Sequence, residues 1–306
     1  MTTDLNYAWI DNWAVIPDTA SGRENGRTHG VCVTNAGHVI VFHQAENGLL
    51  TYDQDGKLIS AVGGDRWLGA HGLTRIEEDG QEYLWLVDQE SREVAKCTLA
   101  GETVQTIERA PHEAYENGGY TPTWAAPNPQ NGDIWVADGY GSSLVHRYSS
   151  AGTYISTLDG TEGAGRFRCP HGINFLETEN GPLLYITDRG NSRVVVYNGE
   201  GTFLKQSTAT HSPCCFDFWD DFALVPELMT GVKVLHASSL ELVTEEGASE
   251  VVTFKSQPDG WPNLAGTPLV KSGQFNSPHG ACFARNGDIY CVEWIIGGRI
   301  TKLQRR

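Results

Sequence analysis

Four apolar segments of this 306-residue chain begin with histidine followed by glycine. The pairs are His29-Gly30, His71-Gly72, His171-Gly172 and His279-Gly280. Neutral imidazole is a preferred ligand of zinc and of neighbouring first-row metals, and three imidazoles with an open position form a catalytic type of metal site. The alternative is a structural role in which channel histidines bind water or backbone only, with glycine used where chain segments crowd together. The elements that carry the histidines decide between the two.

Each His-Gly pair opens a repeat of a common pattern. A short apolar run is followed by a turn with glycine, a strand that ends in an acid, and a strand that ends in an aromatic residue or leucine. Two degenerate copies bring the total to six units. The units start near His29, His71, Thr123, His171, Cys214 and His279. A spacing of about 40 to 50 residues with about four short strands per unit is typical of propeller blades.

The pattern predicts an all-β fold, a six-bladed β-propeller of the NHL-repeat type, as one domain over residues 1–306. Short apolar or alternating runs end at Asn-Gly, Asp-Gly or Gly-Glu-Gly turns, and helical periodicity is absent. The last unit lacks its fourth strand, while residues 7–17 form a strand pattern without a unit. We expect residues 7–17 to be the outer strand of the sixth blade and to close the ring. The last spacing exceeds one blade, so an insertion is expected at residues 245–263.

A propeller would bring distant histidines together, because the first strand of every blade lines the central channel. His71, His171 and His279 belong to alternate blades, about 120° apart around a sixfold ring. We expect these three side chains to bind zinc or another first-row divalent metal. His29 is a further candidate metal ligand, a proton shuttle or a polar wall residue. Cys214 could also ligate, although a buried inert thiol is the alternative.

Several segments carry a resemblance to a known family. They are "TPTWAAPNPQNGDIWVADGYGSSLVHRY", "CPHGINF", "TDRGNSRVVVY" and "SPHGACF…GDIYCVEW". The chain resembles NHL-repeat propellers and, among these, the lyase domain of peptidylglycine α-amidating enzymes. The resemblance spans nearly the whole chain and is strongest from Thr121 to Tyr197.

This resemblance implies a reaction and a set of residues. The family cleaves the N–C bond of a C-terminal α-hydroxyglycine, releasing a peptide amide and glyoxylate, with zinc on three channel histidines. Carried over, the ligands would be His71, His171 and His279. The family's essential tyrosine corresponds to Tyr140 in "ADGYG", and one active-site arginine corresponds to Arg189 in "TDRGN".

Two positions depart from the family pattern. The family's other arginine follows a histidine in the first blade, where this chain has Gln44 after His43. Glutamine lacks the fixed cation that would grip a substrate carboxylate with two hydrogen bonds. Gly280 stands where the family has an acid that helps to bind calcium, which argues against Ca²⁺ here. We therefore expect a small polar substrate, an α-hydroxylated amide or a carboxylate-bearing molecule, instead of the family's peptide.

These residues predict a metal-dependent lyase-like enzyme. Tyr140 would act as general acid or base, and Arg189 would hold a carboxylate or a departing oxyanion. His43 is a weaker candidate for a second proton-transfer group. The structural alternatives are rim packing for Tyr140 and a surface ion pair with Asp188 or Asp138 for Arg189. A lactonase-type hydrolase and a non-catalytic NHL interaction propeller are the alternative functions.

Composition excludes some classes of partner. The chain has 22 basic and 38 acidic residues, a formal net charge of −16, and no cluster of lysine and arginine for nucleic acid or an anionic membrane. The N-terminal segment lacks a signal-peptide pattern, and no stretch has the length of a membrane span. Seven cysteines without disulfide-framework spacing favour a reducing cytoplasm. We expect a cytoplasmic protein with a small-molecule substrate; the oligomeric state is not predicted.

Overall fold

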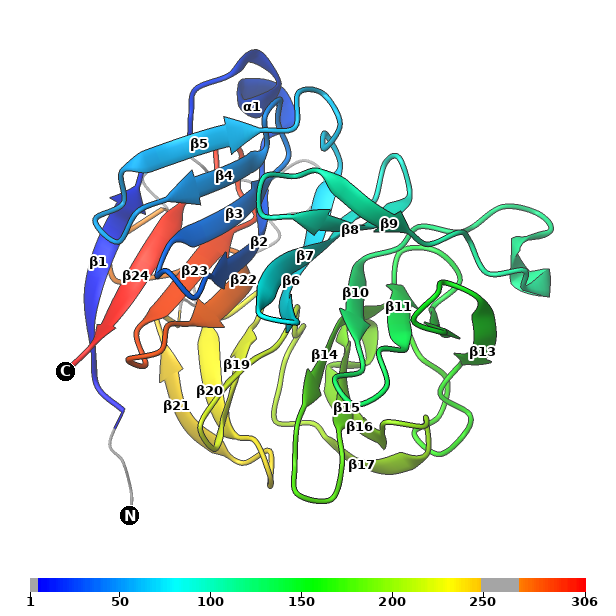
Figure 1. Cartoon of the computed structure of the whole chain (residues 1–306). Helices are drawn as coiled ribbons and strands as arrows, with labels where there is room; N and C mark the ends of the chain where they lie inside the picture. Colours follow the sequence, from blue (N-terminus) through cyan, green and yellow to red (C-terminus); the bar gives the residue numbers. More distant parts are fainter. Residues whose placement is uncertain (1–4, 249–269) are drawn as a thin grey trace. The chain divides into compact units, whose positions relative to one another are not determined.

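The computed structural model describes residues 5–248 and 270–306. Six four-stranded antiparallel sheets make up nearly all the regular structure in these residues, and they are the blades of a six-bladed β-propeller (Figure 1). The predicted fold class is confirmed. The insertion expected at residues 245–263 falls largely outside the described residues. Within the described ranges, no helix is both long and apolar enough to cross a membrane.

The chain divides into two compact units. Unit 1 consists of Met1–Leu68 and Asp217–Arg306 and contains blades 1, 5 and 6. Its elements are β2 (Thr28–Val33), β3 (Val39–His43), β4 (Leu49–Tyr52) and β5 (Leu58–Val62) in blade 1; β18 (Asp217–Trp219), β19 (Phe222–Pro226), β20 (Val232–His236) and β21 (Leu242–Glu246) in blade 5; β22 (Pro278–Phe283), β23 (Ile289–Glu293), β24 (Ile300–Arg305) and β1 (Tyr7–Ala14) in blade 6; and helix α1 (Ala20–Asn25).

Unit 2 consists of Gly69–Phe216 and contains blades 2, 3 and 4. Its elements are β6 (Ala70–Glu78), β7 (Gln81–Asp88), β8 (Glu93–Thr98) and β9 (Thr103–Thr106) in blade 2; β10 (Trp124–Pro127), β11 (Ile134–Asp138), β12 (Leu144–Tyr148) and β13 (Tyr154–Leu158) in blade 3; β14 (Pro170–Leu176), β15 (Leu183–Asp188), β16 (Arg193–Asn198) and β17 (Phe203–Ser207) in blade 4; and the 3₁₀ turns η1 (Glu113–Tyr115) and η2 (Arg189–Asn191).

The N-terminal strand completes the last blade, as expected. β1 pairs antiparallel with β24, from Tyr7 opposite Arg305 to Ala14 opposite Ile300. In Figure 1 the blue strand β1 lies beside the red strand β24. The first and last strands of the chain thus share one ladder, and β1 covers the edge that β24 would otherwise expose.

Apolar side chains fill the spaces between neighbouring blades within each unit. In unit 2 one buried cluster around Trp85 and Val136 joins blades 2 and 3, and another around Trp135 and Ile186 joins blades 3 and 4. Unit 1 has similar clusters between blades 1 and 6 and between blades 5 and 6. Because the middle strands are buried on both faces, their sequences are continuous apolar runs. Truncating one such side chain to alanine typically costs about 2–5 kcal/mol of stability.

A buried carboxylate at the end of the second strand holds the segment that leads into the first strand. In blade 2, Asp88 accepts a hydrogen bond from Gly69 N at 2.8 Å, just before β6. The bond recurs from Thr121 N to Asp138 at 2.6 Å, from Arg168 N to Asp188 at 2.8 Å and from Ser277 N to Glu293 at 3.1 Å. The recurring acid of the sequence repeat therefore has a structural role. In blades 2, 4 and 6 it positions the strand that bears the histidine.

Candidate active site and metal centre

Unit 2 places His71 and His171 at the start of β6 and β14, and both side chains are fully buried. His71 Nδ1 lies 2.8 Å from the backbone oxygen of Thr123, and His171 Nδ1 lies 2.7 Å from that of Cys214. A carbonyl oxygen can only accept, so Nδ1 of each neutral ring donates the proton and Nε2 keeps the lone pair. This tautomer is the one that binds a metal through Nε2.

The two lone pairs face each other. His71 Nε2 and His171 Nε2 are 3.2 Å apart, and the Tyr140 hydroxyl lies 3.1 Å from the first and 3.0 Å from the second. One hydroxyl proton can satisfy only one of two acceptors. Burial lowers the pKa of His71 to about 3, although its hydrogen bond to Thr123 O acts in the opposite direction. The ring is therefore neutral near pH 7 and does not supply a second proton to the cluster. A cation between the rings could bind both nitrogens.

Tyr140 and Arg189 lie together in unit 2. Tyr140 follows β11, and its side chain is 39% exposed although its hydroxyl reaches the two imidazoles. The Arg189 guanidinium lies 5.1 Å from the centre of the tyrosine ring. Burial raises the pKa of Tyr140 to about 12, and the positive charge of Arg189 acts in the opposite direction. The carboxylate of Asp188 binds Arg193 at 2.7 Å, so the ion pair considered for Arg189 is made by another arginine.

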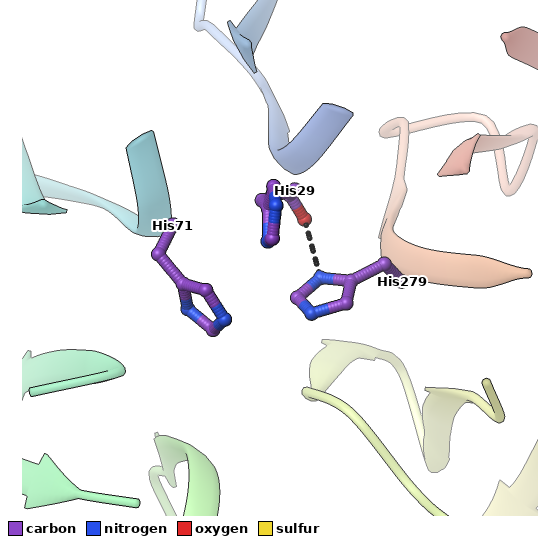
Figure 2. A group of neighbouring side chains, drawn as sticks. All are labelled: His29, His71 and His279. Atoms are coloured by element: carbon purple, nitrogen blue, oxygen red, sulfur yellow. Dashed lines mark hydrogen bonds between the residues drawn. The ribbon is translucent and has the colours of Figure 1, made fainter. Parts of the chain in front are cut away.

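Unit 1 repeats this arrangement with His279 on β22. His279 Nδ1 donates to the backbone oxygen of His29 at 3.1 Å, drawn as a dashed line in Figure 2, and both side chains are 1% exposed. The two imidazole rings are 4.4 Å apart between centres. His279 therefore has the same tautomer as His71 and His171. In all three cases the acceptor is the carbonyl of the equivalent residue in the next blade.

The glycine after each of these histidines allows the carbonyl to approach. A Cβ atom on Gly72 would lie 2.5 Å from Thr123 O, on Gly172 it would lie 2.3 Å from Cys214 O, and on Gly280 it would lie 2.2 Å from His29 O. Any larger residue would therefore push away the carbonyl that orients the preceding imidazole. In these three His-Gly pairs, the glycine makes room for the carbonyl group that sets the tautomer of the histidine.

Buried histidines thus provide a donor set for a metal ion. One set of three side chains that could hold an ion is His29, His71 and His279 (Figure 2), and another is His171, Cys214 and His279. Imidazole and thiolate donors favour zinc and other first-row metals over calcium or magnesium.

His43 ends β3 of unit 1, at the position where the second strands of the other five blades are followed by or end in a buried acid. Its side chain is 2% exposed. A Cβ atom on Gly26 would lie 2.8 Å from its Nε2, so the ring packs closely against the end of α1. Burial lowers the pKa of His43 to about 4. A proton-transfer role for His43 stays a prediction.

Acid should therefore destabilise unit 1 through His43. Its folded pKa lies below its unfolded value of about 6.5, so the stability is fully present above about pH 6.5 and is lost as the pH falls towards 4. The predicted loss is of order 3 kcal/mol. In His43→Leu, which cannot titrate, urea denaturation between pH 7 and pH 4 should show a correspondingly shallower decline. Parallel curves for the two proteins would contradict this assignment.

Sequence reasoning missed a cation beside Gln44. The backbone N–H of Gln44 donates to Arg27 O at 2.9 Å, and the Arg27 guanidinium lies 4.7 Å from the centre of the Trp294 ring. Trp294 N in turn donates to Ser277 O at 2.8 Å, two residues before His279. Arg27 therefore lies next to Gln44 in unit 1. Its contact with Trp294 also links it to the segment that precedes His279. The position of Arg27, two residues before His29, is the feature of the sequence that could have indicated this cation.

No family model matches the chain. Among curated proteins, it is 29% identical over 170 residues to peptidyl-glycine alpha-amidating monooxygenase A of Xenopus laevis, which covers 53% of this chain and 18% of the frog protein. It is 24% identical over 206 residues to a probable peptidyl-alpha-hydroxyglycine alpha-amidating lyase of Caenorhabditis elegans, which covers 58% of this chain and 57% of that protein. Its homologues thus include amidating-lyase-like proteins, although it spans less than two thirds of the length of either.

Solved structures of low identity share the fold. A gluconolactonase from Xanthomonas campestris gives a TM-score of 0.67 at 11% identity, over 98% of this chain and 90% of that one. A catalytically inactive histidine-to-alanine variant of virginiamycin B lyase from Staphylococcus aureus, with quinupristin, gives 0.58 at 14% identity, over 98% and 99%. The relatives and both structures carry the names of enzymes.

Proposed function

We propose that this homologue of amidating-lyase-like proteins is a metal-dependent lyase that cleaves a C–N bond. The substrate class is a small α-hydroxylated amide that carries a carboxylate. The main support is in unit 2, where two imidazole lone pairs and the Tyr140 hydroxyl lie 3.0–3.2 Å from one another. Neutral imidazole is a preferred ligand of zinc, so two imidazole nitrogens this close together support a metal site.

We propose His71, His171 and His279 as the metal ligands, through Nε2. These three share the hydrogen bond from Nδ1 and the glycine that permits it, and His29 supplies a carbonyl to the set. The His29 imidazole is the candidate for a fourth ligand or a proton shuttle. Zinc or a similar ion fits three imidazoles, and when bound it supplies a Lewis acid that lowers the pKa of a substrate hydroxyl. Calcium is not part of the proposal.

The protein's own residues would manage the protons and charges of this reaction. The substrate hydroxyl loses a proton, its oxygen forms a carbonyl, and the C–N bond breaks with its electron pair going to nitrogen, which takes up a proton. The products are an amide and an aldehyde that bears the carboxylate. Tyr140 would give or take the proton, and Arg189 beside it would stabilise the negative charge that develops on oxygen.

Arg27 would supply the carboxylate-binding cation that Gln44 does not. Its guanidinium lies over the Trp294 ring and also donates to Asn25 through Nη1. A planar guanidinium matches the geometry of a carboxylate. We therefore propose Arg27 as the group that binds the substrate carboxylate. In this proposal Arg27, the hydrogen-bonded neighbour of Gln44, takes the role that the family gives to the arginine at position 44.

Arg27→Gln is expected to raise KM for a carboxylate-bearing α-hydroxyamide by about 10- to 100-fold and to change kcat by less than about threefold, because binding is lost equally in the ground and transition states. A substrate with a neutral group in place of the carboxylate should be unaffected. Steady-state rates of aldehyde release measure both. Arg23→Gln is the control, since it removes the same charge from an exposed pair with Asp18. An equal loss on the neutral substrate would contradict the assignment.

Metal content and product release together test the proposed function. Elemental analysis of the purified protein should find about one first-row metal per chain. A panel of α-hydroxyamides should yield aldehyde or glyoxylate, and chelation should stop the release. A protein without metal and without turnover would instead be an interaction propeller, which is the alternative from a different class.

A lactonase-type hydrolase is the second candidate, because a gluconolactonase shares the fold. Lactone hydrolysis that exceeds α-hydroxyamide cleavage would favour it. For partners, we propose a small molecule and neither nucleic acid nor a membrane, since the net charge of −16 disfavours polyanions. The cysteine spacing supports a reducing compartment, the cytoplasm, as the proposed location.

A further inference from the structure

The connection between blades 2 and 3, residues 107–121, contributes a buried tyrosine to blade 3. It contains η1, and the side chain of Tyr115 at the end of this turn is 3% exposed. The Tyr115 hydroxyl lies 2.7 Å from Asp138 Oδ2 and 2.5 Å from His146 Nε2. All three side chains lie within unit 2, and Asp138 and His146 are completely buried.

The donor and the acceptor of each hydrogen bond in this cluster follow from the chemistry of its side chains. A carboxylate only accepts, so Tyr115 donates its one proton to Asp138 and accepts from His146 Nε2–H. His146 Nδ1 then accepts from the Thr157 hydroxyl at 2.8 Å, and Thr157 accepts from Tyr154 at 2.8 Å. Burial lowers the pKa of His146 to about 3, which keeps the ring neutral and the direction unique. The chain of donors ends on Asp138.

Asp138 is also the anchor of the loop that carries Tyr140. Its two oxygens accept from Thr121 N and Ser142 N, each at 2.6 Å, on either side of the tyrosine. Tyr140 N donates to Thr121 O at 3.3 Å. A Cβ atom on Gly141 would lie 1.9 Å from Gly119 O, so the connection packs tightly on this loop.

The equivalent acids of blades 2, 4 and 6 have different third partners. Asp88 binds the hydroxyl of Ser91 in its own loop, Asp188 binds Arg193, and Glu293 binds Arg299. Among blades 2, 3, 4 and 6, the tyrosine from a preceding connection occurs in blade 3. Blade 3 is also the one whose loop presents Tyr140 to His71 and His171.

We propose that Tyr115 is a positioning residue for Tyr140. By donating to Asp138 it completes three hydrogen bonds to one carboxylate and fixes residues 138–142. This places the Tyr140 hydroxyl between the two imidazoles. The inference rests on the proposed function for its effect on rate, but the restraint on the loop is independent of that function.

Tyr115→Phe removes the hydroxyl and keeps the ring. We expect kcat to fall about 10- to 100-fold with KM nearly unchanged, because a displacement of about 1 Å in a reacting group has an effect of that size. In a Tyr140→Phe background, the same substitution should cause no further loss of kcat, since it acts through the missing hydroxyl. A further loss of similar size would overturn the inference and indicate general destabilisation.

Hydrogen exchange supplies a readout without turnover. Amides of residues 138–143 should exchange faster in Tyr115→Phe than in the wild type. Tyr154→Phe is the matched control, since it removes one hydroxyl from the other end of the same donor chain, and it should leave these amides and kcat near wild type. Unchanged exchange in Tyr115→Phe, or an equal change in Tyr154→Phe, would overturn the inference. If the wild type has no lyase activity, the proposed function fails, and the exchange result alone decides the role of Tyr115.

Discussion

His171→Ala should reduce the metal content of the purified protein to background and lower lyase activity by more than about a thousandfold. His171 Nε2 is 3.2 Å from His71 Nε2, and its Nδ1 is held by Cys214 O, so alanine removes a preoriented donor. Elemental analysis and single-turnover assays measure the two losses. Circular dichroism and thermal denaturation would confirm that the variant is folded.

Two further variants distinguish the ligand sets. If the ligands are His71, His171 and His279, Cys214→Ser retains metal, because only its carbonyl oxygen is used. His29→Ala should also retain metal, with at most a partial loss of rate from a proton shuttle. Full metal content and full activity in His171→Ala would eliminate the proposed site. Loss of metal in His29→Ala with retention in His171→Ala would instead assign the metal to the set of His29, His71 and His279.

Tyr140→Phe should lower kcat by about 10²- to 10⁴-fold with little change in KM or metal content, the range for loss of a general acid or base. The hydroxyl lies 3.0 Å and 3.1 Å from two imidazole nitrogens, where a substrate hydroxyl bound to the metal would come within reach. Steady-state kinetics and elemental analysis separate loss of chemistry from loss of metal. A variant that keeps full kcat would exclude Tyr140 from proton transfer.

The pKa of Tyr140 gives an independent check. Burial raises it to about 12 in the protein without metal, so the hydroxyl should stay protonated through pH 10. The difference between wild-type and Tyr140→Phe absorbance at high pH would show this titration. Loading with zinc should move the titration to lower pH, because a nearby cation favours the phenolate. An unchanged titration on loading would place the tyrosine too far from the metal for this role.

Local sequence patterns determined the blades. Each blade is a set of consecutive antiparallel strands with glycine-containing turns, so its period is visible in the order of residues alone. The leftover strand at residues 7–17 indicated the partner of the last blade, and β1 pairs with β24 as expected. Part of the candidate site could also be predicted from the sequence. His71 and His171 share a repeat position, and Tyr140 lies with them in unit 2.

Tertiary structure alone decided how these residues are oriented. The proton on His71 is placed by a carbonyl 52 residues away, and Tyr140 is held by a tyrosine from the preceding connection through Asp138. Arg27 became a candidate through a backbone bond from Gln44 and a stack on Trp294. Spacing in the sequence carries the repeat, because strand pairing within a blade is local. It does not carry tautomers or loop restraints, because these depend on which backbone and side-chain groups meet when separate blades pack together.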